Sequence, residues 1–158
     1  YEATCFRAPN EEIVASIIAQ IKDTGLDGIA ITEHYARDYG FKVRKIVEES
    51  FNNEVLIIPG WEIDVSGRQE VELFLPNGSI FRYLAHPGFP INSYFIENVQ
   101  GIEIDNALHN WHIDKEKVKA LAEEHDLLLL KNSDAHSIEW IGRFYNEIDL
   151  EELVARAR

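Results

Sequence analysis

The stretch "LLLLKNSDAHS", residues 127–137, runs four leucines directly into an aspartate and a histidine. An apolar run this short between polar turn residues is typical of a strand buried on both faces of a parallel sheet, although periodicity alone leaves a buried helix open. In parallel α/β folds, ligands and catalytic groups collect at the carboxyl ends of the strands. Asp134 and His136 are therefore predicted to lie in a functional site.

Strand-like and helix-like segments alternate along the rest of the chain. Helices are predicted at 11–25, 42–51, 114–126 and 149–157, and strands at 1–6, 26–32, 55–65, 101–105, 127–130 and 144–148, with a hairpin at 71–86. Asn10 is the expected N-cap of the first helix and Gly25 its end, and Pro76, Asn77 and Gly78 form the hairpin turn. This alternation favours right-handed crossovers and a mainly parallel sheet of about seven strands, which could close into a barrel.

Length and composition indicate one folded domain over residues 1–158, with 46% hydrophobic residues. No apolar run reaches the roughly 20 residues of a membrane span and no signal peptide is found, so no membrane partner is expected. Cys5 is the only cysteine, which fits a reducing cytoplasm. The net charge of −13 repels phosphate backbones, so extended nucleic acid is not an expected partner.

Ligand-type side chains follow five successive predicted strands, at the same end of each. They are His34, Glu62, His86, His109 and the pair Asp134 and His136. A single histidine is more often structural, but this repeated position is harder to explain without a shared site. Imidazole with carboxylate is the ligand set of zinc, manganese and iron, and strand ends in a barrel converge near its axis. The sequence therefore predicts a metal site.

Two further histidines are interpreted as structural. His112 lies just before a predicted helix, where a helix-entry or surface role is expected. His125 lies at the end of that helix beside Glu123 and Glu124, where the helix dipole favours a cation.

Five motifs occur in the order and spacing of a known family. They are "GLDGIAITEH" (25–34), "IPGWEI" (58–63), "LAHPG" (84–88), "GIEIDNALH" (101–109) and "NSDAHS" (132–137). The series resembles the polymerase and histidinol phosphatase family, or PHP domains, over nearly the whole chain. The resemblance implies a distorted (β/α)7 TIM-like barrel with up to three metal ions at the carboxyl ends of the strands. It also implies hydrolysis of phosphate esters.

The resemblance also assigns metal ligands. It implies that Glu62, His86 and His109 hold a second metal, that Glu62 and Asp134 contribute to a first, and that His34 and His136 contribute to a third. We expect divalent zinc, manganese or iron at this centre.

The beginning of the chain departs from the family pattern. Thr4 and Phe6 stand where family members carry a His-x-His pair on the first strand. Neither side chain replaces imidazole as a ligand, so we expect one or two metal ions rather than three. Phe6 is predicted to point into the cleft beside Glu62 and Asp134, unless a shifted strand register makes it a core residue.

The function predicted from these residues is a metal-dependent phosphoesterase acting on a small phosphorylated molecule. Arg7, Lys131 and Arg143 lie near predicted strand ends and are candidates for phosphate binding. One alternative is a degenerate PHP domain with a structural or regulatory binding role and little catalysis. Another is hydrolysis of a carbon–nitrogen bond by an amidohydrolase-type site, against which the order of the motifs argues.

Overall fold

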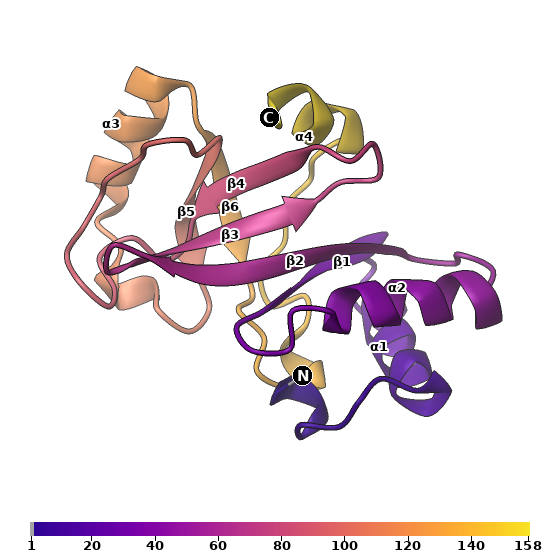
Figure 1. Cartoon of the computed structure of the whole chain (residues 1–158). Coiled ribbons are helices and arrows are strands. Elements are labelled where there is room, and N and C mark those ends of the chain that lie inside the picture. The colour runs from indigo at the N-terminus through magenta and orange to yellow at the C-terminus, as the bar shows by residue number, and fades with distance from the viewer. Residues whose placement is uncertain (1) are drawn as a thin grey trace.

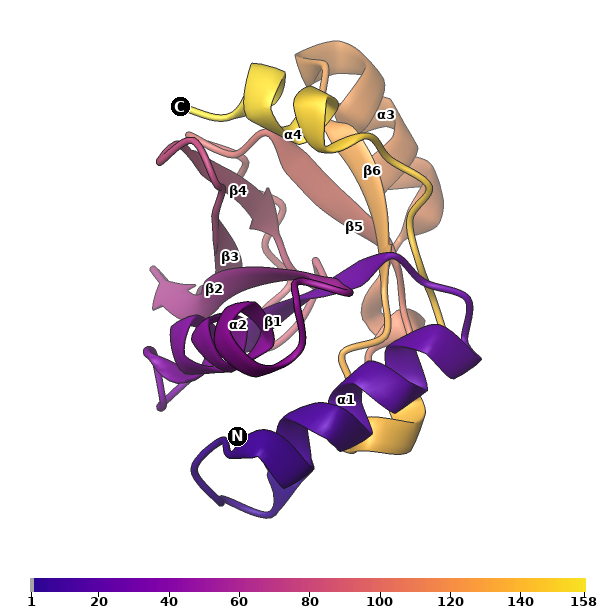
Figure 2. The ribbon, with the colours of Figure 1, turned by 90° about the vertical axis from the view of Figure 1, so that its right-hand side faces the viewer.

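The computed structural model describes residues 2–158, and within this range six strands form one curled sheet (Figures 1 and 2). The strands are β1 (Gly28–Glu33), β2 (Leu56–Val65), β3 (Arg68–Phe74), β4 (Ile80–Leu84), β5 (Gly101–Asn106) and β6 (Leu128–Asn132). Their order in the sheet is their order in the chain. Figure 2 shows the sheet curled into an open half-barrel, with β1 and β2 below β4 and β5.

The sheet is mixed rather than mainly parallel. β1 pairs with β2, β4 with β5 and β5 with β6 in parallel, whereas β3 is antiparallel to both of its neighbours. The reason lies in the short connections on either side of β3, because only antiparallel strands can be joined by a tight hairpin. Ser66 and Gly67 both have positive φ, as the favoured two-residue hairpin turn requires. The turn predicted at 76–78 joins β3 to β4.

The predicted (β/α)7 barrel does not close within residues 2–158, where β1 and β6 are the unpaired edges of the sheet. The strand predicted at 1–6 is wrong for the described part, since Glu2–Thr4 forms the 3₁₀ helix η1. Cys5 and Phe6 then take positive φ values of 52° and 59°, which extended backbone does not allow. The strand predicted at 144–148 is also absent. Instead, the Asn146 side chain bonds to the backbone of Lys131 in β6, accepting from its N–H at 2.8 Å and donating to its C=O at 2.9 Å.

Four α-helices in the described range agree with the predicted segments. They are α1 (Glu11–Asp23), α2 (Tyr39–Ser50), α3 (Lys115–His125) and α4 (Leu150–Arg156). The Asn10 side chain accepts a hydrogen bond from the backbone N–H of Ile13, which confirms the predicted N-cap of α1. No helix in this range is both long enough and apolar enough to cross a bilayer.

The apolar core lies on both faces of the sheet. α1 and α2 pack against β1 and β2 on the outer face, and α3 packs against β5 (Figure 1). The inner face of the half-barrel holds Val71, Phe81 and Leu130, and Leu153 of α4 packs into the same cluster. Because the C-terminal Arg158 pairs with Ile80 at the start of β4, α4 lies at the end of the half-barrel opposite the carboxyl ends of the parallel strands.

Candidate metal centre

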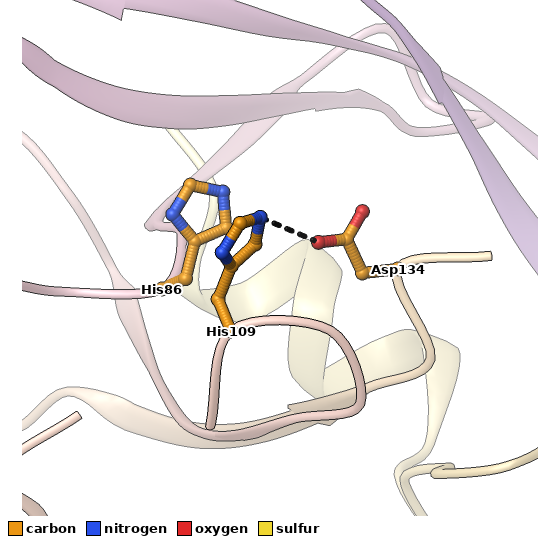
Figure 3. Close-up of side chains that lie close together, drawn as sticks. All are labelled: His86, His109 and Asp134. Atoms are coloured by element: carbon orange, nitrogen blue, oxygen red, sulfur yellow. Dashed lines mark ion pairs between the residues drawn. The ribbon is translucent and has the colours of Figure 1, made fainter. Parts of the chain in front are cut away.

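Three side chains that follow neighbouring parallel strands meet at one end of the sheet. His86 comes two residues after β4, His109 three residues after β5, and Asp134 two residues after β6. One ligand atom from each lies within 4.8 Å of the others (Figure 3). The parallel order of β4, β5 and β6 brings these sequence-distant residues together, as expected for ligands at carboxyl strand ends.

The arrangement of this trio fits a divalent cation. His86 is 3% exposed, and the His109 ring lies 4.7 Å from it between centroids. Within residues 2–158, the buried Nδ1 atoms of both rings have no hydrogen-bond partner. A buried polar atom without a partner is costly, and imidazole nitrogen is a preferred ligand of zinc, manganese and iron. The Asp134 carboxylate, 3.9 Å from His109 Nε2, adds the negative charge that a cation needs.

Glu62 extends the trio along the sheet. It is buried on β2, and its Oε1 lies 2.9 Å from Nε2 of His86. Its Oε2 lies 3.4 Å from Nε2 of His34, which directly follows β1. The carboxylate therefore lies between two imidazoles.

His136 and Glu2 continue the cluster on the other side of Asp134. His136 Nε2 lies 3.3 Å from Asp134 Oδ1, and its Nδ1 lies 2.9 Å from Glu2 Oε2. Contacts thus link all six side chains singled out from the sequence into one cluster, with Glu2 as a member that no motif indicated. That these residues bind metal stays a prediction.

A cavity of about 340 Å³ opens beside this cluster. Its polar wall includes five of the predicted residues, namely His34, Glu62, His86, Asp134 and His136. The rest of the wall is the apolar inner face of the half-barrel, including Val71 and Phe81. The cavity has the size expected of a small-molecule site.

Comparison with known proteins found similarity in one segment and in the fold. Residues 112–158, which contain Asp134 and His136, match a family model described as PHP-associated. The chain also resembles a crystal structure described as "a putative metal-dependent phosphoesterase" from Bifidobacterium adolescentis, with a TM-score of 0.69, 12% identity and 90% of each chain covered. In this segment and in its fold, the chain is similar to proteins of PHP type. No protein among the curated sequences matches it.

The N-terminal segment of the chain does not occupy the cleft as predicted. Phe6 is 63% exposed, so the prediction that its ring fills the volume beside Glu62 and Asp134 is wrong. The physical reason is that residues 2–4 coil into η1 instead of extending along the sheet. Thr4 is buried, and its hydroxyl lies 2.8 Å from the hydroxyl of Tyr39 in α2.

The three basic residues proposed for phosphate binding contact other groups. Arg7 Nε donates to the backbone C=O of Thr4 at 3.3 Å, and Arg143 lies over the Trp140 ring. Lys131 Nζ lies 4.0 Å from Oδ2 of Asp105 in β5. Of the three, Lys131 alone is among the residues that line the cavity beside the cluster.

The histidines interpreted as structural lie outside the trio. His125 ends α3, and its Nε2 lies 3.7 Å from Glu124. His112 packs against the rings of Phe89 and Trp111, at centroid distances of 5.0 and 5.2 Å. Phe89 in turn stacks on His109 at 4.3 Å and fixes the plane of that ring.

Burial and charges around the candidate metal centre shift the pKa values of two histidines in opposite directions. Burial lowers the pKa of His86, but the Glu62 hydrogen bond and the charges of Glu103, Glu62 and Asp134 outweigh burial and raise it overall. Burial and the neighbouring His86 lower the pKa of His109. The lowered pKa favours the neutral form of His109, which is the form that binds metal.

Two buried polar residues beside the trio were not identified from the sequence. Glu103 and Asn106 both lie on β5 and both bond to parts of the centre. Side chains alternate between the two faces of a regular strand, so residues three positions apart are expected on opposite faces. The sequence pattern therefore does not indicate that Glu103 and Asn106 are partners. A register shift between Glu103 and Asp105 inserts the extra residue that brings them to the same face.

Proposed function

We propose that this PHP domain is a metal-dependent phosphoesterase that hydrolyses a small phosphorylated molecule. The proposal rests on the trio His86, His109 and Asp134, whose ligand atoms converge within 4.8 Å. Two imidazoles with a carboxylate are a preferred ligand set of divalent zinc, manganese and iron, which supports metal binding there.

The residues present would hold zinc, manganese or iron, as one or two ions. His86, His109 and Asp134 would form one binding position, and Glu62 with His34 a neighbouring one. A divalent ion bound there supplies neutralisation of the phosphate charge and increased acidity of a bound water molecule.

The chain itself would orient the substrate and handle protons. His34 lies at the more exposed side of the cluster, where the ring nitrogen that does not face Glu62 can donate to a phosphate oxygen. Glu62 lies between His34 and His86 and can accept a proton from either ring. The apolar inner face of the half-barrel limits water access to the cluster. Interactions between charges are stronger in such a low-dielectric environment.

The size and charge of the molecule favour a small substrate. A cavity of about 340 Å³ accommodates one small molecule rather than a polymer strand. The net charge of −13 opposes an extended polyanion, whereas bound cations reverse the field locally for a single phosphate.

A second candidate is a binding or regulatory PHP domain with little catalysis. The observation that favours it is the N-terminal segment, in which Thr4 is hydrogen-bonded to Tyr39 and Phe6 is exposed. Residues 2–10 contain no histidine to complete the ligand set.

Metal analysis combined with a phosphatase assay tests the proposal. The purified chain should contain or take up zinc or manganese and hydrolyse p-nitrophenyl phosphate, and a chelator should abolish the activity. His109→Ala should remove both properties. His125→Ala is the matched control, because this exposed histidine of α3 lies outside the cluster, and it should keep both. Absence of hydrolysis, with or without bound metal, overturns the proposal and favours the second candidate.

A further inference from the structure

We propose that Glu103 and Asn106 are positioning residues that hold His86, His109 and Asp134 in metal-binding geometry through one buried hydrogen-bond network. The inference rests on the proposed metal centre and goes beyond its ligands. Each step of the network is a contact between named atoms.

Glu103 fixes the segment that carries His86. Its side chain is 2% exposed, and its Oε2 accepts the backbone N–H of His86 at 2.6 Å. His86 has a φ of +23°, a conformation that non-glycine residues rarely adopt. Strained residues of this kind persist only where surrounding groups hold them. The bond from Glu103 is such a restraint, and it acts on the backbone of His86 rather than on the imidazole.

Asn106 fixes the other two members of the trio. It is fully buried, and its Nδ2 donates to Asp134 Oδ2 at 3.2 Å and to Glu103 Oε2 at 3.0 Å. Its Oδ1 accepts the backbone N–H groups of Leu108 and His109, at 2.9 and 2.8 Å. One amide therefore restrains the Asp134 carboxylate and the backbone of His109 together. Asp134 also has a positive φ, of 46°, and needs a similar restraint.

Asn132 completes the network from β6. Its Nδ2 donates to Glu103 Oε1 at 2.6 Å, and its Oδ1 accepts from Asn146 Nδ2 at 3.2 Å. Both oxygens of Glu103 are thus occupied by donors from the chain. Glu103 therefore acts through the ligands rather than as a ligand, in the way that outer partners orient the groups bound to a metal.

The polarity of the Glu103–Asn132 pair provides a sharp test. Glu103→Gln places an amide N–H₂ against the donors that now surround the carboxylate. The double variant Glu103→Gln with Asn132→Asp reverses donor and acceptor in this pair and conserves the total charge. The acceptors for His86, Asn106 and Asn146 are retained in the double variant.

The experiment measures Co²⁺ affinity and the visible spectrum of the Co²⁺-loaded full chain, with thermal melts alongside. We expect Glu103→Gln to weaken Co²⁺ binding by about 10-fold to 100-fold and to shift the spectrum, which reports ligand geometry. The double variant should recover the wild-type spectrum and most of the affinity. Gln100→Ala is the control, because Gln100 is a buried amide at the opposite end of β5 that bonds to Arg82 and Asn98. It should leave Co²⁺ binding unchanged.

The outcomes separate this inference from the proposed function. If the wild-type chain binds no Co²⁺, the metal centre itself is overturned, and the inference with it. If the wild type binds and Glu103→Gln binds equally well, only the positioning role is overturned. A double variant that folds but binds as weakly as Glu103→Gln also overturns it. Should Glu103→Gln fail to fold, Asn106→Ala serves in its place: a folded variant with unchanged Co²⁺ affinity and spectrum refutes the role, and a loss of about 10-fold or more supports it.

Discussion

Oε1 of Glu62 lies 2.9 Å from Nε2 of His86, although Glu62 belongs to β2 and His86 follows β4. β3 lies between these two strands in the sheet, so the contact crosses the concave face of the half-barrel. This contact joins β2 to the segment after β4, and it therefore restrains the curvature of the sheet beside the candidate metal centre.

Replacing Glu62 by glutamine should lower the pKa of His86 in the metal-free protein. Burial lowers this pKa, and the hydrogen bond and negative charge of Glu62 help to raise it above its ordinary value. The variant removes the negative charge of Glu62 and weakens its hydrogen bond, so the lowering effect of burial on the His86 pKa is less opposed. NMR titration of the His86 ring measures the effect. Asp64→Asn, an exposed position on the same strand, should leave the titration unchanged, and an unchanged pKa in Glu62→Gln would show that the contact has no electrostatic effect.

Glu103 should make the stability of the metal-free protein depend on pH. Burial raises the pKa of this carboxyl to about 7 from its ordinary 4.5, although bonds from Asn132, His86 and Asn106 act in the opposite direction. Between these two values the folded chain binds more protons than the unfolded chain. The contribution of Glu103 is therefore fully present below pH 4.5 and is lost as the pH rises through 7, by about 3 kcal/mol.

The contribution of Glu103 to the free energy of unfolding can be measured by urea unfolding at several pH values. The metal-free wild type is compared with metal-free Glu103→Gln. As the pH rises from 4.5 to 7, the free energy of unfolding of the wild type should fall relative to that of Glu103→Gln. A difference that stays constant over this range would contradict the raised pKa.

Asn146→Ala should lower the free energy of unfolding by about 1–3 kcal/mol, because it leaves the backbone N–H and C=O of Lys131 without their side-chain partner. Asn92→Ala, in an exposed segment, is the control and should change stability little. Chemical denaturation of both variants and of the wild type measures these changes in the free energy of unfolding. Equal stability would mean that water replaces Asn146 at the edge of β6 without cost.

Gly88→Ala should disturb the segment after β4 more than a similar change elsewhere. A Cβ at Gly88 would lie 2.3 Å from the backbone oxygen of His112, and its φ is +100°. Gly78 also has a positive φ, of 85°, but a Cβ there meets open space. Gly78→Ala should therefore cost about 1–2 kcal/mol from φ alone, and Gly88→Ala more. Thermal melts compare them, and metal affinity should fall only in Gly88→Ala because His86 lies two residues away.

Local features of the chain were predictable because they depend on neighbouring residues. Asn10 bonds to a backbone N–H three residues along, so a polar residue before an apolar helical stripe was enough to place the start of α1. The strand ends that carry His86, His109 and Asp134 were likewise marked by apolar runs that stop at polar residues. These two kinds of signal were sufficient to indicate helices, strands and a set of ligand-type side chains.

What the sequence determined by itself was therefore the identity of the elements and the candidate ligands, since hydrophobic period and capping are encoded within a few residues. The tertiary structure alone decided how the elements pair and what surrounds the ligands. The exposure of Phe6, the open edge at β6 and the shared face of Glu103 and Asn106 follow from backbone turns and a register shift. A shift of one residue exchanges the faces of a strand without changing its apolar pattern, so contacts between distant segments set the outcome.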